Sequence, residues 1–196
     1  MFVQLIQGKV SSREDLERQI HRWDADLRPG AVGFLGTTAG VTADGMAFLA
    51  ARFASEEQAR ANSARSEQGA WWTETEKCFS GPVAFIDSSD VQVVIEPTDD
   101  AGFVQVITST VSDRARLEAL NERVSSELAT SRPDVIGAVT VWDGDRAIDI
   151  TYFSSEAEAR EGEKKELPAE HKAIFEEWQS LLSDVTYLDL SSPLLL

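Results

Sequence analysis

The stretch FVQLIQGKVSSREDL at residues 2–16 decides the fold, because it returns halfway along the chain as FVQVITSTVSDRARL at residues 103–117. Eight of the fifteen aligned positions are identical. The correspondence continues where ARFASEEQAR at 51–60 lies opposite TYFSSEAEAR at 151–160, and the offset between the copies changes only from 101 to 100 residues. Similarity that persists over this distance indicates an internal duplication of one structural unit.

Both copies predict the same series of elements. A β-rich first strand ends at a serine that can cap a helix, and apolar residues then recur at helical spacing. These residues are Leu16, Ile20, Trp23 and Leu27 in the first copy and Leu117, Leu120, Val124 and Leu128 in the second. A hairpin with an Asp-Gly turn follows at 44–45 and at 143–144. A second capped helix and a last strand, VAFIDSSDVQVVI at 83–95 or DVTYLDL at 184–190, complete each copy.

The order strand, helix, strand, strand, helix, strand is that of a ferredoxin-like unit. We expect one unit at residues 1–97, a linker at 98–102 and a second unit at 103–196. Such a unit covers only one face of its sheet with helices, yet FLAARF and AIDITYF carry apolar residues on both faces. The sequence therefore predicts an α+β fold whose two units pack sheet to sheet as a pseudo-dimeric α+β barrel within one chain. A monomer is the favoured state, and a homodimer is the alternative.

The composition limits the classes of partner. The 196 residues contain 18 Lys and Arg against 34 Asp and Glu, and the net charge of -16 repels nucleic acid and anionic lipid surfaces. No apolar stretch approaches the roughly 20 residues that cross a bilayer, and the N-terminus lacks the pattern of a signal peptide. The single cysteine, Cys78, is interpreted as a buried thiol in a reducing compartment. We therefore expect a cytoplasmic protein without nucleic-acid or membrane partners.

The junctions ARFASEEQARA and TYFSSEAEARE resemble the aromatic-x-Ser-x-Glu-Ala junction of the dimeric α+β barrel superfamily, in particular of proteins related to antibiotic-biosynthesis monooxygenases. This superfamily includes cofactor-free oxygenases, haem-degrading enzymes, isomerases and ligand-binding proteins, and the resemblance implies a site between the sheet and the helices of one unit. Haem-degrading members carry an asparagine on the first strand, where this chain has Gln4 and Gln105. His171 and Trp178 stand in the reverse order to the tryptophan and histidine of those enzymes. We therefore do not expect this chain to degrade haem.

No cofactor or metal site is predicted. The glycines of GFLGTTAG at 33–40 belong to a strand and turn without a following helix start, and the chain contains no HExxH motif, serine nucleophile elbow or diagnostic carboxylate pair. His171 is the candidate catalytic residue, because histidine is the only side chain that titrates naturally near neutral pH. The favoured alternative is a surface histidine on an amphipathic helix, since spacing fixes no second reactive group beside it.

Four tryptophans are candidate ligand-binding residues, namely Trp71, Trp72, Trp142 and Trp178. Consecutive residues on a helix point about 100° apart, so Trp71 and Trp72 cannot both face one core. One of these two indoles lines a cavity, or both cover the ends of the interface between the halves; both interpretations stay open.

Two amides and one cation complete the predicted ligand-binding set. Gln4 and Gln105 recur at the same strand position and require partners, which are a ligand or, preferably, side chains of a neighbouring strand. Arg52 interrupts an apolar strand, as does Asp149 opposite Leu49 in the repeat, so these positions mark divergence between the halves. This divergence suggests that, if there is a pocket, only one of the two halves uses it.

Two functions remain open at the level of the sequence. The favoured one is binding of a small apolar or aromatic molecule without turnover, because no catalytic set is evident. The alternative is a cofactor-independent, monooxygenase-like or isomerase-like enzyme that acts on an aromatic or polyketide-like substrate.

Overall fold

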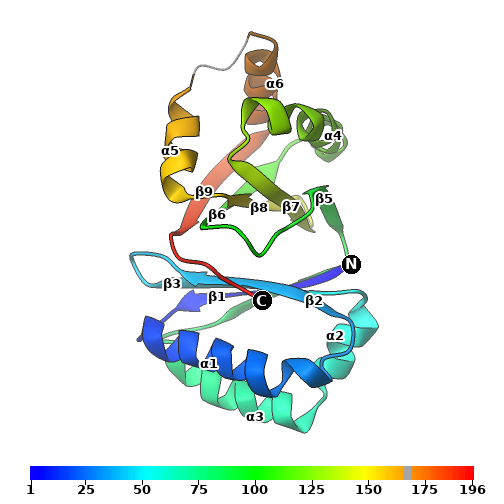
Figure 1. The fold of residues 1–196 in the computed structure, drawn as a ribbon. Coiled ribbons are helices and arrows are strands. Elements are labelled where there is room, and N and C mark those ends of the chain that lie inside the picture. The colour runs from blue at the N-terminus through cyan, green and yellow to red at the C-terminus, as the bar shows by residue number, and fades with distance from the viewer. Residues whose placement is uncertain (166–168) are drawn as a thin grey trace. The chain divides into compact units, whose positions relative to one another are not determined.

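A computed structural model describes residues 1–165 and 169–196, with the side chains at 124–130 and 169–171 outside the description. The predicted stripe residues Val124 and Leu128 therefore lie outside the described side chains. The chain divides into two compact units, Met1–Asp90 with Ser192–Leu196 (unit 1) and Val91–Ser191 (unit 2). Each unit holds one five-stranded antiparallel sheet with helices on one of its faces (Figure 1). The predicted α+β class with ferredoxin-like units is confirmed.

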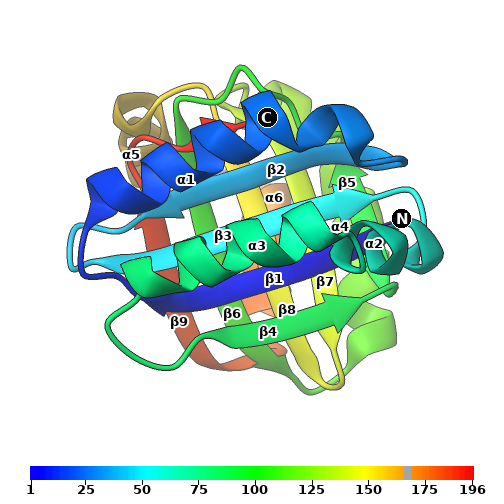
Figure 2. The same cartoon turned by 90° about the horizontal axis from the view of Figure 1, so that it is seen from below.

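Unit 1 is built from the first copy of the repeat and the last residues of the chain. Its elements are β1 (Phe2–Lys9), α1 (Arg13–Asp26), β2 (Phe34–Val41), β3 (Met46–Phe53), α2 (Glu56–Ser63), α3 (Ser66–Thr75), β4 (Ala84–Ser88) and β10 (Leu194–Leu195), with short 3-10 helices at Arg28–Gly30 and Glu76–Cys78. The strand order is β10-β2-β3-β1-β4. Figure 2 shows α1 and α3 lying across the same face of this sheet.

Unit 2 repeats the arrangement with the second copy. Its elements are β5 (Val91–Ile95), β6 (Phe103–Val111), α4 (Arg114–Ser131), β7 (Val135–Asp143), β8 (Arg146–Phe153), α5 (Glu156–Lys164), α6 (Ala169–Ser180) and β9 (Leu182–Leu190). The strand order is β5-β7-β8-β6-β9, so the first strand of each copy lies beside the third and the last. Within the described residues, no helix is both long and apolar enough to cross a membrane.

Serine caps begin the helices that the sequence marks with capping boxes. The Ser12 hydroxyl accepts a hydrogen bond from the Asp15 amide at 3.2 Å and caps the start of α1. Ser55 begins α2 and Ser155 begins α5 by the same contact with the amide three residues on, each at 3.2 Å. The cap is thus a feature that both copies keep.

The predicted last strand at 83–95 is split between the two units. The Ser88 hydroxyl accepts a hydrogen bond from the Asp90 amide at 3.1 Å, and this local turn ends β4. β4 pairs with β1 in unit 1, whereas β5 pairs with β7 in unit 2. At the other end of the chain β10 pairs with β2. Each sheet therefore receives its fifth strand from outside its own repeat, and β2 and β7 are not left as open edges. The predicted linker at 98–102 stays a prediction about domain organisation.

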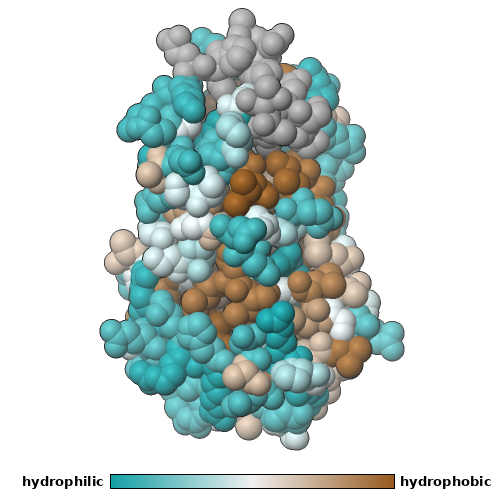
Figure 3. Space-filling model, viewed as in Figure 1, coloured by the Kyte–Doolittle hydropathy of each residue, from teal (hydrophilic) through white to brown (hydrophobic). Residues whose placement is uncertain are grey.

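The apolar core of each unit lies between its sheet and its helices. In unit 1 the main cluster consists of Ile6, Leu16, Ile20, Ala39, Val41, Ala47, Leu49, Cys78 and Phe79. Burial raises the pKa of the Cys78 thiol above its ordinary value, which makes the thiol a poor nucleophile. In unit 2 apolar side chains also reach the surface (Figure 3), among them Phe175, Val185 and Tyr187. Exposed apolar side chains also occur in unit 1, among them Val32, Leu35 and Phe85.

Candidate functional site

Unit 1 contains a cavity of about 60 Å³ between its sheet and its helices. The apolar walls are Ile6, Leu49 and Phe53 from the sheet, Trp23 from α1, Trp71 from α3 and Leu196 at the end of the chain. The polar atoms in the wall come from side chains that carry no charge, chiefly Gln4, Asn62 and Gln68. The site is thus an apolar, aromatic chamber with amides at its margin, as small-molecule sites commonly are.

Hydrogen bonds hold the two indoles of this cavity in place. Trp23 Nε1 donates to Gln68 Oε1 at 2.7 Å, and this bond joins α1 to α3. Trp71 Nε1 donates to the carbonyl oxygen of Gln19 at 2.8 Å, which ties α3 back to α1. Because both polar ends are satisfied by the protein, the apolar faces of the rings are the parts offered to a ligand.

The adjacent tryptophan has a different position. Trp72 is half-buried, and its ring packs against Phe85 of β4 at 5.2 Å and Phe79 at 6.2 Å between centroids. It is not among the residues that line the cavity, whereas Trp71 is. The structure therefore separates the two indoles, with Trp71 facing the cavity and Trp72 covering the sheet beyond it.

Gln4 and Gln105 each find a partner on the neighbouring strand. Gln4 Nε2 donates to Asp87 Oδ1 at 2.9 Å, and Gln105 Nε2 donates to Asp189 Oδ1 at the same distance. In unit 2 the carboxylate of Asp189 is also paired with Arg160. These aspartates were not predicted, although FID at 85–87 and YLD at 187–189 carry them at matching places in the last strands of the two repeats.

Arg52 is placed away from the cavity. Leu49, Ala51 and Phe53 of β3 line the cavity, and Arg52 alternates with them, so it projects from the other face of the sheet. Its register partner on β2 is Gly36, where an added Cβ would lie 2.4 Å from Arg52 Nη2. The glycine thus leaves the space that the guanidinium occupies.

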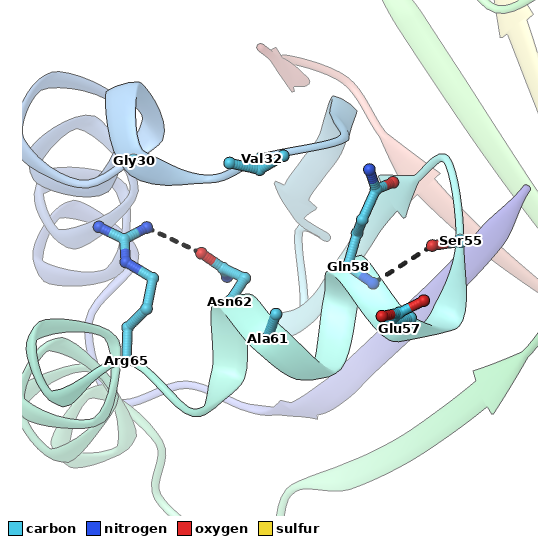
Figure 4. A pocket seen from close by; sticks show the side chains of 8 residues that line it. All are labelled: Gly30, Val32, Ser55, Glu57, Gln58, Ala61, Asn62 and Arg65. Carbon is cyan, nitrogen blue, oxygen red and sulfur yellow. Dashed lines mark hydrogen bonds between the residues drawn. The ribbon is translucent and has the colours of Figure 1, made fainter.

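A second hollow lies on the surface of unit 1 beside α2. It measures about 320 Å³ and is lined by Gly30, Val32, Ser55, Glu57, Gln58, Ala61, Asn62 and Arg65 (Figure 4). Arg65 Nη1 donates to Asn62 Oδ1 at 2.9 Å and to the carbonyl oxygen of Leu27 at 3.0 Å, and its Nε faces Glu67. These bonds fix the end of α1 to the junction of α2 and α3, so the arginine is already used structurally.

The predicted tryptophans of unit 2 come together in one cluster. Trp142 of β7 is buried with Val111 and Leu117, and Trp178 of α6 packs against this cluster. The Arg114 guanidinium lies 4.3 Å from the Trp142 ring centroid, a cation–π contact. The side chain of His171 lies outside the described residues, so its role as a proton-transfer group stays a prediction.

A buried carboxyl lies on the helix-facing side of the sheet in unit 2. Asp149 Oδ1 accepts a hydrogen bond from the Thr140 hydroxyl at 2.5 Å, while Asp149 Oδ2 is enclosed and meets no hydrogen-bond donor among the described residues. Burial raises the pKa of Asp149 from its ordinary value of 3.8 to about 6, and the bond from Thr140 opposes that shift. A carboxyl in this state is a candidate functional group. In the sequence, Asp149 stood out because it interrupts an otherwise apolar strand.

Among the described residues, no group of three or more His, Cys, Asp or Glu side chains is arranged to hold a metal ion.

Solved structures with the same fold cover the whole chain at low sequence identity. A protein from Lactobacillus acidophilus, described provisionally as a monooxygenase, is 14% identical with a TM-score of 0.72, and the match covers 100% of this chain and 98% of that one. An anthrone oxidase-like protein is 12% identical with a TM-score of 0.67, at 100% and 92% coverage. An uncharacterised ferredoxin-fold protein from Listeria monocytogenes, related to antibiotic biosynthesis monooxygenases, is 12% identical with a TM-score of 0.53, at 99% and 95% coverage.

No protein-family model matches the sequence, and a comparison with curated proteins finds no match. The likeness is therefore one of fold, and it extends over both repeats. The chain has the tandem α+β fold of proteins related to the antibiotic-biosynthesis monooxygenases.

Proposed function

We propose that the protein binds a small apolar or aromatic molecule between the sheet and the helices of unit 1. The observation that carries the proposal is the cavity walled by Trp23, Trp71 and Phe53 with their apolar surfaces turned inward. Rigid aromatic walls with few polar groups suit a ligand that is itself planar and apolar. The name of the anthrone oxidase-like protein, which has the same fold, points to an aromatic compound in that protein and supports the same ligand class here.

The size of the cavity sets a condition on binding. An apolar cavity of about 150 Å³ is needed for benzene, so a cavity of about 60 Å³ has to widen before a ring can enter. Leu196 follows the two-residue edge strand β10 and is joined to β2 by two backbone hydrogen bonds with Thr37, of 2.9 and 3.0 Å, so moving it breaks fewer strand bonds than moving a wall residue of β1 or β3. Ligand entry is then coupled to a shift of the last residues of the chain.

Binding without turnover is favoured over catalysis at this cavity. Its polar lining consists of amide and hydroxyl side chains, chiefly Gln4, Asn62 and Gln68, and these do not exchange protons near neutral pH. Such a lining supports binding of an apolar molecule. A monooxygenase-like or isomerase-like reaction remains the alternative function.

Calorimetric titration with naphthalene tests the proposal on the full chain. Ala51→Phe places a ring in the unit 1 cavity and should abolish the binding heat, whereas Thr151→Phe alters the equivalent strand position of unit 2 and should leave it intact. Loss of binding in Thr151→Phe alone would show that the ligand binds in unit 2. Equal binding by the unsubstituted chain, Ala51→Phe and Thr151→Phe would overturn the proposal. An aerobic turnover screen on quinol-like substrates separates binding from catalysis.

A further inference from the structure

The surface hollow beside α2 carries opposite charges at its two ends. Figure 4 places Arg65 at one end of the hollow and Glu57 at the other, with Val32 and Ala61 between them. Arg65 follows Glu57 by eight positions, which corresponds to about 12 Å along a helix that rises about 1.5 Å per residue. The hollow, of about 320 Å³, is large enough for a small molecule that reaches from one end to the other.

The walls of the hollow are accessible from solvent. Val32 is 74% exposed, and Ala61 on the opposite wall is exposed as well. Glu57 is also exposed, and its carboxylate has no hydrogen-bond or ion-pair partner among the described residues. In contrast to the enclosed cavity of unit 1, this hollow can therefore take a ligand without any part of the chain moving first.

Arg65 is held in place and still has donors to offer. Its Nη1 donates to the Leu27 carbonyl oxygen and to Asn62, and its Nε donates to Glu67. The two N–H groups of Nη2 meet no acceptor among the described residues. Gly30 leaves the space beside this atom, since an added Cβ there would lie 2.6 Å from Nη2. A guanidinium fixed in this way is preorganised to donate to a carboxylate.

Unit 2 has the same backbone at this place but carries its own charged pair there. The Ala54 amide donates to the Gly33 carbonyl oxygen at 2.8 Å, and the Ser154 amide donates to the Asp134 carbonyl oxygen at 2.9 Å. Gly33 and Asp134 are therefore equivalent. The Asp134 carboxylate is paired with Arg132 at 2.8 Å, and both side chains are largely buried.

Arg132 also lies against the equivalent wall of α5. An added Cβ at Gly162 would lie 2.4 Å from Arg132 Nε. Because α2 and α5 align with an offset of 100 residues, Gly162 corresponds to Asn62 of the hollow, and Ala157 corresponds to Glu57. Unit 2 thus satisfies its charges within the chain, whereas in unit 1 the opposite charges stand apart with an open space between them.

We propose that this hollow binds a free small molecule that has a carboxylate at one end, an ammonium group at the other and a short aliphatic chain between them. The carboxylate accepts hydrogen bonds from Arg65 Nη2, and the ammonium group pairs with Glu57. The aliphatic chain packs on Val32 and Ala61. The net charge of -16 disfavours a ligand that carries only carboxylates, whereas a ligand with both charges adds no net charge.

Titration of the full chain, followed by the NMR shifts of its backbone amides, measures both the affinity and the position of binding. The probe is ω-aminohexanoate; hexanoate lacks its ammonium group, and hexylamine lacks its carboxylate. We expect ω-aminohexanoate to bind at least about tenfold more tightly than hexylamine, because hexylamine makes no charge-assisted hydrogen bond with Arg65. It should bind about threefold more tightly than hexanoate, because an exposed ion pair contributes less. The shifted amides should include those of Gly30, Val32 and Gln58.

A charge swap at Glu57 separates ligand recognition from an effect on the fold. Glu57→Lys should weaken ω-aminohexanoate binding at least about threefold and should create binding of adipate, which has a carboxylate at each end. Damage to the fold cannot produce such a gain. Glu56→Lys is the matched control, because Glu56 is the neighbouring residue on α2 but does not line the hollow. This control should keep the preference for ω-aminohexanoate over adipate.

Equal affinity for ω-aminohexanoate, hexanoate and hexylamine would overturn the proposal. Adipate binding that Glu57→Lys leaves unchanged would do the same. A tripeptide that ends in lysine presents the same two charges, and tighter binding of this peptide would overturn the assignment to a free small molecule. Glu57 does not line the unit 1 cavity, so these results are independent of naphthalene binding there.

Discussion

Leu49 and Asp149 occupy the same place in the two units, each directly opposite the isoleucine of its first strand, Ile6 or Ile107. One is part of an apolar core cluster, and the other is a buried carboxyl with one unpartnered oxygen among the described residues. The duplication therefore supplies an internal reference for the effect of Asp149 on stability. A substitution that makes unit 2 resemble unit 1 tests whether the carboxyl is retained for stability or for another purpose.

The first prediction concerns the pH dependence of Asp149→Leu relative to the unsubstituted chain. Because the folded protein holds the pKa of Asp149 at about 6, above its ordinary value of 3.8, the stabilising contribution of this group is fully present below the ordinary value and is lost as pH rises through about 6. From a pH of about 4 to about 7, the unsubstituted chain should lose about 2.4 kcal/mol of unfolding free energy relative to Asp149→Leu. Urea unfolding of both proteins at the two pH values measures the difference, and parallel pH profiles would contradict it.

Gly36 gives a second prediction. Its φ is +150°, and an added Cβ would lie 2.4 Å from Arg52 Nη2 and 2.9 Å from the Leu196 carbonyl oxygen. Gly36→Ala should therefore lower the free energy of unfolding by roughly 1–3 kcal/mol. Gly69 in α3 is the control, because nothing lies within 4 Å of an added Cβ and Gly69→Ala should stabilise the helix by about 1 kcal/mol. Equal effects of the two substitutions, measured by urea unfolding, would be inconsistent with this reasoning.

The repeated helix caps give a third prediction. Ser55→Ala and Ser155→Ala each remove the hydroxyl that accepts from the amide three residues on, so each should cost about 1 kcal/mol of stability. The conservative variants Ser55→Asp and Ser155→Asp retain an acceptor and should cost much less. Thermal unfolding of the four variants measures these changes in stability. A large loss of stability in the aspartate variants would point to a role of the serines beyond capping.

Leu196 gives a fourth prediction, which links stability to ligand binding. Its side chain packs against two core clusters of unit 1 and lines the cavity. Leu196→Ala should destabilise the protein by about 2 kcal/mol and at the same time widen the cavity, so naphthalene should bind more tightly. Unfolding and calorimetric titration of the same sample measure both effects, and weaker naphthalene binding would show that Leu196 forms the ligand contact.

The sequence predicted the elements that depend on local chemistry. The stripe of Leu16, Ile20 and Trp23 is buried on α1 as its spacing indicates, and the Asp-Gly turns place Gly45 and Gly144 at φ of 85° and 66°. Such features depend on neighbours within a few residues, so a pattern in the chain is sufficient to predict them.

Features that depend on distant pairing were predicted less well. The turn at Ser88 that ends β4 is local, but the pairing of β5 with β7 of the other repeat is not indicated by any pattern near Val91. The partners of Gln4 and Gln105 lie more than 80 residues away. At the candidate sites, the sequence singled out Trp71 and Asp149 as unusual residues. The cavity beside Trp71 and the hydrogen-bond donors beside Asp149 could not be predicted, because they depend on the pairing of strands that are far apart in sequence.

The pairing of β10 with β2 also has a consequence for folding during translation. Translation delivers β2 early, but the two leucines that protect its edge, Leu194 and Leu195, are made only after the strands and helices of the second repeat. A nascent chain must therefore carry an uncovered strand edge through the synthesis of the whole second repeat, at the stage when unpaired edges are most prone to join those of other chains. Synthesis of β10, rather than completion of the first repeat, is therefore the event that allows the sheet of unit 1 to be completed.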